Sequence, residues 1–259
     1  MRRAARLLLA TLAIAGAHHC VDAAENRQTL LRWLGHGFFV LATRGGIKVA
    51  VDPFDDGATG YILPKQILAN VALVTQETNT SGATGRLSGS PDIFRSITAT
   101  GVNRGSGLSL LGIPTFSDPE RGALGGRSVI FIFEADGIRF AFAGTLNQRL
   151  SLADLRLARK VDVLVSGFGP RLGPDGLLAT ATALRAKVLI PAAFKTALSG
   201  DINASDVSPL ADQARHHDST TLALSAADLP KKTEVWMLAL PGPEQRKKEA
   251  IDFPGMREE

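Results

Sequence analysis

The sequence predicts one α/β domain built as a layered sandwich, in which two sheets are covered by helices. The 259 residues are 45% apolar and 21% charged, with 26 glycines and 13 prolines, a profile typical of a globular chain with a substantial core. Short β-type runs dominate the first part of the chain, and strands alternate with helices in the second. No repeat of fixed period and no low-complexity linker divides the chain, so we expect a single domain.

The first 23 residues have the features of a cleaved secretory signal peptide. Three arginines precede an apolar stretch at residues 7–17, and small residues follow near position 23. A membrane anchor would need roughly 20 apolar residues, and two histidines interrupt this stretch too early. A lipid anchor at Cys20 is the other alternative, but a histidine stands where a small residue should precede the cysteine. We therefore expect a periplasmic or secreted protein with no stable membrane anchor after cleavage.

Cleavage after residue 23 would change the composition that bears on function. The only cysteine would be removed, which excludes disulfides and thiol catalysis in the mature chain. Loss of three arginines and one aspartate would lower the net charge from +4 to +2, and nucleic acid is not an expected partner. Histidine would fall from five residues to three, namely His36, His216 and His217.

The predicted domain spans residues 24–240, and strands dominate its first part. Glycine-rich turns and a long polar segment at 52–64 separate runs of apolar and β-branched residues. Asp136-Gly137 between two such runs is a strong signal for a hairpin. The expected strands are 30–34, 38–42, 47–51, 71–75, 108–116, 128–135 and 138–143.

Strands and helices alternate in the second part of the domain. Ser151 and Asp154 have the spacing of a capping box, which predicts a helix from residue 151 to residue 160. After it we expect strand 161–165, helix 174–185, strand 187–190, helix 205–216 and strand 235–240. The tail at 241–259 is rich in charge and proline, and we expect it to be a loose surface extension.

Six short motifs follow one another in an order that points to a known family. They are Trp33-Leu34-Gly35-His36-Gly37, the run 46–54 that contains Asp52-Pro53, the strand that ends at Val74-Thr75, the segment 131–144, and the strands at 161–164 and 188–191. This order resembles the metallo-β-lactamase superfamily, above all its lactonase-like branch. The resemblance implies an αββα sandwich with one or two zinc ions at one edge of the sheets. Zinc would lower the pKa of a bound water and supply hydroxide for hydrolysis.

The positions that bind zinc in this family hold other residues in this chain. The first family ligands come from an H-x-H-x-D-H motif directly after a strand, and three more follow later along the chain. The matching positions here hold Gln76, Thr78, Thr80, Ser81, Ser117, Thr145 and Ala193. None of these side chains is a good zinc ligand, so we expect neither zinc nor another cofactor at this site.

Four further polar residues belong to the candidate site: His36, Asp52, Glu77 and Asp118. They could hold a weak metal other than zinc, but they do not occupy the ligand positions of the family. The simpler interpretation of His36 is a structural residue in a turn flanked by glycines. The simpler interpretation of Asp52 is a strand end that accepts hydrogen bonds from the following loop.

Three classes of function remain open, and a binding protein is the leading hypothesis. In it, the former active-site cleft of a non-catalytic member binds a small molecule or an envelope protein. The enzyme alternative is a hydrolase of lactone, ester or phosphoester bonds with an atypical metal site, and a third is a structural partner in an envelope complex. The sequence has no G-x-S-x-G elbow, no S-x-x-K motif and no phosphate-binding loop, which disfavours other hydrolase and nucleotide-binding schemes.

Overall fold

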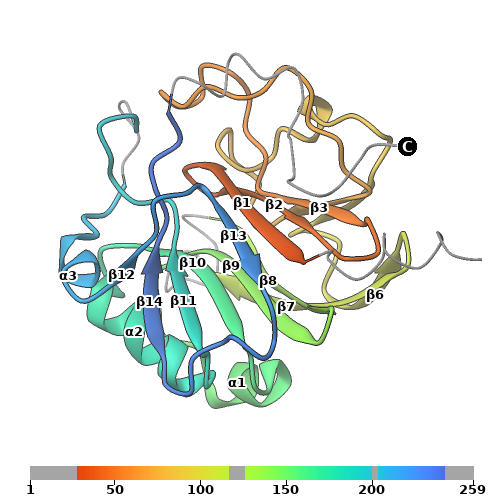
Figure 1. Cartoon of the computed structure of the whole chain (residues 1–259). Coiled ribbons are helices and arrows are strands. Elements are labelled where there is room, and N and C mark those ends of the chain that lie inside the picture. The colour runs from red at the N-terminus through yellow and green to blue at the C-terminus, as the bar shows by residue number, and fades with distance from the viewer. Residues whose placement is uncertain (1–27, 117–125, 200–203, 243–259) are drawn as a thin grey trace, which may run out of the picture.

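Two mixed β-sheets packed against each other form the core of the protein (Figure 1). The structure is a computed structural model, and it describes residues 28–116, 126–199 and 204–242. The expected signal peptide with Cys20 and the tail beyond residue 242 lie outside the described residues. None of the helices within the described ranges is long and apolar enough to span a membrane.

The six-stranded sheet has the order β13-β1-β2-β3-β4-β5. Strands β1, β2 and β3 pair antiparallel, whereas β4 and β5 continue the sheet in parallel. Loops that follow β3 and β4, orange to yellow in Figure 1, lie over the face of this sheet away from the second sheet, and β1, β2 and β4 are buried along their whole length. The bounds are β1 Thr29–Gly35, β2 Phe38–Ala42, β3 Lys48–Val51, β4 Val71–Val74, β5 Asp92–Arg95 and β13 Thr221–Leu224.

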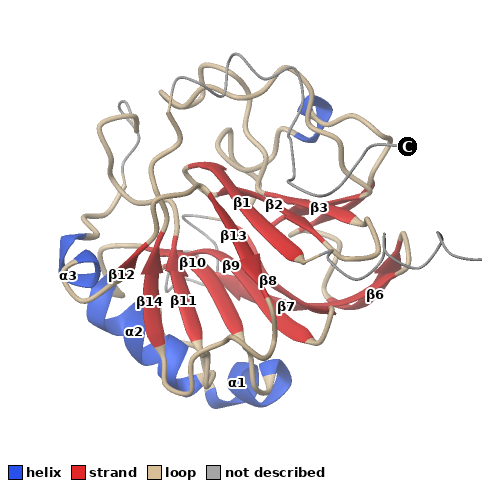
Figure 2. Cartoon of the chain, in the orientation of Figure 1, coloured by secondary structure: helices blue, strands red, loops and turns tan. Residues whose placement is uncertain are grey.

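The eight-stranded sheet has the order β12-β14-β11-β10-β9-β8-β7-β6. Strands β6 to β9 form an antiparallel meander, and β9, β10, β11, β14 and β12 are parallel. In the described part of the chain, the α-helices cover the outer face of this sheet (Figure 2). The bounds are β6 Gly101–Gly105, β7 Leu108–Phe116, β8 Arg127–Ala135, β9 Ile138–Leu146, α1 Leu152–Ala158, β10 Val163–Phe168, α2 Gly173–Ala183, β11 Val188–Pro191, α3 Ser208–Ala211, β12 Arg215–His216 and β14 Glu234–Met237.

Local sequence signals placed the β8–β9 hairpin and the start of α1 correctly. Asp136 and Gly137 both adopt positive φ, at 53° and 78°, as a tight hairpin turn requires. The Asp136 carboxylate also accepts hydrogen bonds from Thr29 Oγ1 and from the amide of Arg44, so the turn fastens one sheet to the other. At α1, the Ser151 hydroxyl accepts from the Asp154 amide at 3.1 Å, which completes the predicted capping box.

The prediction of a helix over residues 205–216 is wrong. Helix α3 has only four residues, and the chain then turns into the edge strand β12. Arg215 and His216 pair with the backbone of β14, and the Arg215 guanidinium lies 5.5 Å from the ring centre of Trp236. These tertiary contacts override the local helical pattern. His216 is therefore a strand residue at the edge of the eight-stranded sheet, whereas the turn that carries His36 belongs to the six-stranded sheet.

Aromatic side chains fill the space between the sheets. Phe133, Phe140 and Phe142 stack on one another within the eight-stranded sheet, and Phe142 reaches Phe39 of β2 with 6.4 Å between ring centres. Phe142 also lines the cleft described below.

Candidate functional site

A small cleft of about 40 Å³ lies where the ends of strands from both sheets meet. Turns after β1, β3, β4 and β11 contribute to it, as do the last residues of β9. Carboxyl ends of parallel strands commonly form binding sites, because the loops that follow them converge at one edge. The lining residues are His36, Gly37, Val51, Asp52, Thr75, Gln76, Thr78, Thr80, Ser81, Phe142, Gly144, Thr145, Val165, Ala192 and Ala193.

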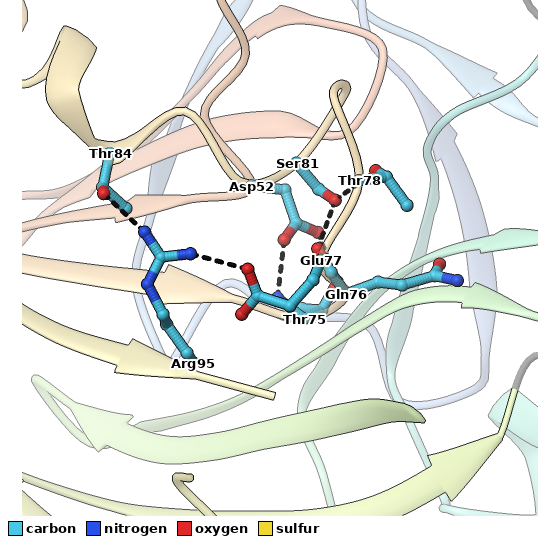
Figure 3. Close-up of polar contacts among 8 residues, drawn as sticks. All are labelled: Asp52, Thr75, Gln76, Glu77, Thr78, Ser81, Thr84 and Arg95. Atoms are coloured by element: carbon cyan, nitrogen blue, oxygen red, sulfur yellow. Dashed lines mark hydrogen bonds and ion pairs between the residues drawn. The ribbon is translucent and has the colours of Figure 1, made fainter. Parts of the chain in front are cut away.

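Most of the residues selected from the sequence meet in this cleft, although they come from five separate parts of the chain. Glu77 is an exception: it does not line the cleft, and its carboxylate pairs with the Arg95 guanidinium at 2.6 Å (Figure 3). Ser117 and Asp118 lie outside the described residues. The residues that the structure brings together are His36, Asp52, Gln76, Thr78, Thr80, Ser81, Thr145 and Ala193.

Asp52 is buried at the end of β3, and both of its carboxylate oxygens are engaged by one residue. The amide of Thr75 donates to Oδ1 at 2.7 Å, and the Thr75 hydroxyl donates to Oδ2 at 2.6 Å. Burial raises the pKa of Asp52 from 3.8 to about 7, against the lowering effect of the two Thr75 bonds, and the nearby charge of Glu77 raises it further. Asp52 thus joins β3 to β4, and with this raised pKa its carboxyl group is only partly ionised at neutral pH.

His36 occupies the turn between β1 and β2, and the residue is 8% exposed. Its main-chain carbonyl accepts from Trp33 Nε1 at 2.9 Å and from the Ala193 amide at 3.0 Å. The ring nitrogen Nδ1 is buried and finds no hydrogen-bond partner in the part of the chain that the structure describes. Burial lowers the pKa of His36 from 6.5 to about 4, so the imidazole is neutral at pH 7.

Hydroxyl groups on the loop after β4 form a connected network, part of which Figure 3 draws with Asp52. The Ser81 hydroxyl donates to the carbonyl of Gln76 at 2.5 Å, and Thr78 Oγ1 lies 2.6 Å from Ser81 Oγ and 3.2 Å from Thr80 Oγ1. Backbone bonds from Ser81 and Gly82 to the Thr78 carbonyl tighten the loop. The network fixes the positions of its oxygens and presents uncharged donors and acceptors.

The backbone around the cleft is strained at three residues that are not glycine. His36, Asp52 and Ala193 have φ values of 47°, 50° and 50°, in the left-handed region that L-residues avoid. Each such residue costs on the order of 1 kcal/mol, and strain of this kind gathers at functional sites. Gly144 is also left-handed at 56°, and a β-carbon there would overlap the Thr75 hydroxyl. Thr75 and Gly144 were not among the site residues chosen from the sequence, because their roles depend on the close approach of Gly144 to the Thr75 side chain.

The ionisable residues of the described lining do not fit the zinc centre that the resemblance implies. His36 and Asp52 are its only ionisable residues, and both oxygens of Asp52 already hold Thr75. Within the described ranges, no group of three or more His, Cys, Asp or Glu side chains could hold a metal ion. Hydroxyls, an amide and a methyl group make up the other positions of the family pattern, and these are weak ligands for zinc.

Comparisons with known proteins agree with this architecture. Residues 30–193 match the model of the beta-lactamase superfamily domain. The fold is similar to that of a protein from Thermotoga maritima assigned to the zinc-dependent hydrolases of the metallo-β-lactamase superfamily, with a TM-score of 0.65, 24% identity, and coverage of 81% of this chain and 98% of that one. It is also similar to Igni18, a metallo hydrolase from Ignicoccus hospitalis, with a TM-score of 0.52, 15% identity, and coverage of 83% and 96%. No curated protein matches. From its domain match and its two mixed sheets, the chain belongs to the metallo-β-lactamase superfamily.

Proposed function

We propose that this superfamily member is a non-catalytic protein that binds a small ligand, or one group of a protein partner, in the cleft without zinc. The observation that carries the proposal is the chemistry of the cleft wall. Both ionisable side chains in the described lining are driven toward their neutral forms, and the remaining polar groups are hydroxyls and one amide. Hydrolysis by this fold would need several anionic or imidazole donors to hold the metal that activates water.

The cleft nevertheless has the properties of a maintained site. His36, Asp52 and Ala193 keep an unfavourable left-handed backbone there. A hydrogen bond from the Ala193 amide to the His36 carbonyl joins loops of the two sheets. A wall that had lost all use would be expected to relax toward unstrained residues and to fill with apolar side chains. These features support binding over a purely structural role.

Metal analysis of the full chain, purified without chelators, tests the proposal. We expect far less than one equivalent of zinc, manganese or iron per chain, and no saturable zinc binding by calorimetry. The double variant Gln76→His, Thr78→His restores two imidazoles on the loop after β4 and should bind zinc more tightly than the parent protein. Glu77→His is the matched control, because Glu77 lies on the same loop but does not line the cleft.

Near-stoichiometric metal in the parent protein, lost on His36→Ala or Asp52→Asn, would overturn the proposal. It would favour the alternative, a hydrolase of lactone, ester or phosphoester bonds with an atypical metal site. Hydrolysis of such model substrates by the metal-loaded parent protein, and its loss in the same variants, would complete that case.

Export to the periplasm or medium is the second part of the proposal, and the amino-terminal sequence supports it. Three arginines followed by an apolar stretch at residues 7–17 are typical of a secretory signal. Cell fractionation should find the protein outside the cytoplasm, with a mature amino terminus at residue 24. An uncleaved chain in the cytoplasm would contradict this part alone and would leave the argument about the cleft intact.

A further inference from the structure

The lining of the cleft combines apolar and hydroxyl-bearing groups from different elements. Strands β3, β9 and β10 supply apolar groups from Val51, Phe142 and Val165, whereas the loop after β4 supplies the hydroxyls of Thr78, Thr80 and Ser81. A ligand that satisfies both needs C–H groups on one face and hydrogen-bonding groups on the other. Carboxylates, phosphates and ammonium groups lack the first property.

The described part of the lining offers little charge to pair with an ionic ligand. No lysine or arginine is among the described lining residues, so an anionic ligand would lose its hydration without a compensating cation. The only carboxyl group, Asp52, already accepts two bonds from Thr75 and is a poor partner for a cationic ligand. An uncharged ligand avoids both desolvation penalties.

One residue of the same lining carries an unpartnered polar atom, which makes the choice more specific. His36 lines the cleft, the residue is only 8% exposed, and its Nδ1, itself shielded from solvent, has no hydrogen-bond partner among the described residues. Buried polar atoms of this kind are rare, and each calls for a ligand, a water or a functional reason. Hydroxyl groups both donate and accept, so they suit a neutral imidazole and a wall of threonine and serine hydroxyls equally well.

We propose that the cleft recognises an uncharged polyhydroxyl group, of the kind found at one end of a polyol or a sugar, with its C–H face against Phe142 and Val165. This inference rests on the proposed function and names its ligand class. A single water needs roughly 10–15 Å³ on this measure. The cleft volume of about 40 Å³ therefore accommodates a fragment of about three heavy atoms. A larger ligand would insert only its end.

Three small probes with one carbon skeleton test the inference: glycerol, glycerate and 3-aminopropane-1,2-diol are neutral, negative and positive at pH 7. Each is titrated into the ¹⁵N-labelled full chain while the amide shifts of residues 75–81, 144–145 and 192–193 are followed. We expect saturable shifts in these segments with glycerol, and an affinity at least about tenfold lower for both charged probes. Thr145→Val removes one lining hydroxyl and should weaken glycerol binding about three- to tenfold, the value of one neutral hydrogen bond. Thr182→Val, on the exposed part of α2, is the matched control and should leave it unchanged.

The outcomes separate this inference from the proposed function. Tighter binding of glycerate or of the amine in the same segments would overturn the neutral-ligand class and would leave a metal-free binding cleft standing. Shifts with none of the three probes, or glycerol shifts that Thr145→Val does not alter, would also overturn it. A stoichiometric metal found in the parent protein would overturn both.

Discussion

Asp52 and His36 make opposite contributions to stability as pH changes, and removal of one should reveal the other. In the folded protein the pKa of Asp52 is raised from 3.8 to about 7, chiefly by burial. Between these two values the unfolded chain has lost the Asp52 proton and the folded chain has kept it. The free energy of unfolding therefore falls by about 1.4 kcal/mol per pH unit, or about 4 kcal/mol in all, as pH rises through this window.

His36 works in the other direction over nearly the same range. Burial lowers its pKa from 6.5 to about 4, so between these values the unfolded chain holds a proton that the folded chain has released. The free energy of unfolding rises by about 3 kcal/mol from pH 4 to pH 6.5 for this reason. In the parent protein the contributions of Asp52 and His36 to the pH dependence of the free energy of unfolding therefore nearly cancel.

Asp52→Asn separates the two contributions while keeping the shape of the side chain. The amide oxygen can still accept from the Thr75 amide, and the Thr75 hydroxyl can turn to accept from the new NH₂ group. Urea unfolding of the variant and the parent protein is measured from pH 4 to pH 8. The stability of the variant relative to the parent should increase by about 4 kcal/mol across this range, because every other titrating group is shared.

A matched control and a clear refutation accompany this measurement. Asp228→Asn removes an exposed carboxylate and should change relative stability by less than about 0.5 kcal/mol at any pH in the range. If the difference between Asp52→Asn and the parent protein stays within about 1 kcal/mol from pH 4 to pH 8, Asp52 is ionised in the folded protein, and the account of a neutral cleft is wrong.

Three further substitutions test individual parts of the structure. Gly144→Ala places a β-carbon on the Thr75 hydroxyl in left-handed backbone, so it should lower the free energy of unfolding by about 2–4 kcal/mol. The melting temperature measured by circular dichroism should fall, and an unchanged value would contradict the close approach of Gly144 to Thr75. Ser151→Ala removes the cap of α1 and should cost about 1 kcal/mol in urea unfolding, whereas a neutral result would mean that the cap is dispensable. Glu77→Gln breaks a partly exposed ion pair with Arg95 and should change stability by less than about 1 kcal/mol; a larger loss would give Glu77 a role beyond that pair.

The sequence predicted the buried elements of the fold better than its edges. Strands such as β2 and β7 consist of long apolar or alternating runs, and the Asp136-Gly137 turn needs only local chemistry. The edge strands β5 and β6 are short and largely exposed, so no apolar pattern marks them. Their pairing depends on neighbours that are distant in the sequence.

The candidate site was predictable only where the order of family motifs could be followed along the chain. That order selected Gln76, Thr145 and Ala193, which the structure brings to one cleft. Glu77 was added as a nearby carboxylate outside the family's ligand positions, and it pairs with Arg95 and does not line the cleft. Nothing in the sequence indicates that Thr75 holds both oxygens of Asp52. The binding role of the cleft stays a prediction.

The bond from the Ala193 amide to the His36 carbonyl has a consequence for folding. It closes the cleft between residues from opposite parts of the chain, and the two sheets must already be docked before it can form. Contacts between such distant residues form slowly, because loop closure must precede them. An occupant of the cleft would therefore bind only the fully assembled domain. Its binding would slow hydrogen exchange throughout both sheets, rather than in the surrounding loops alone.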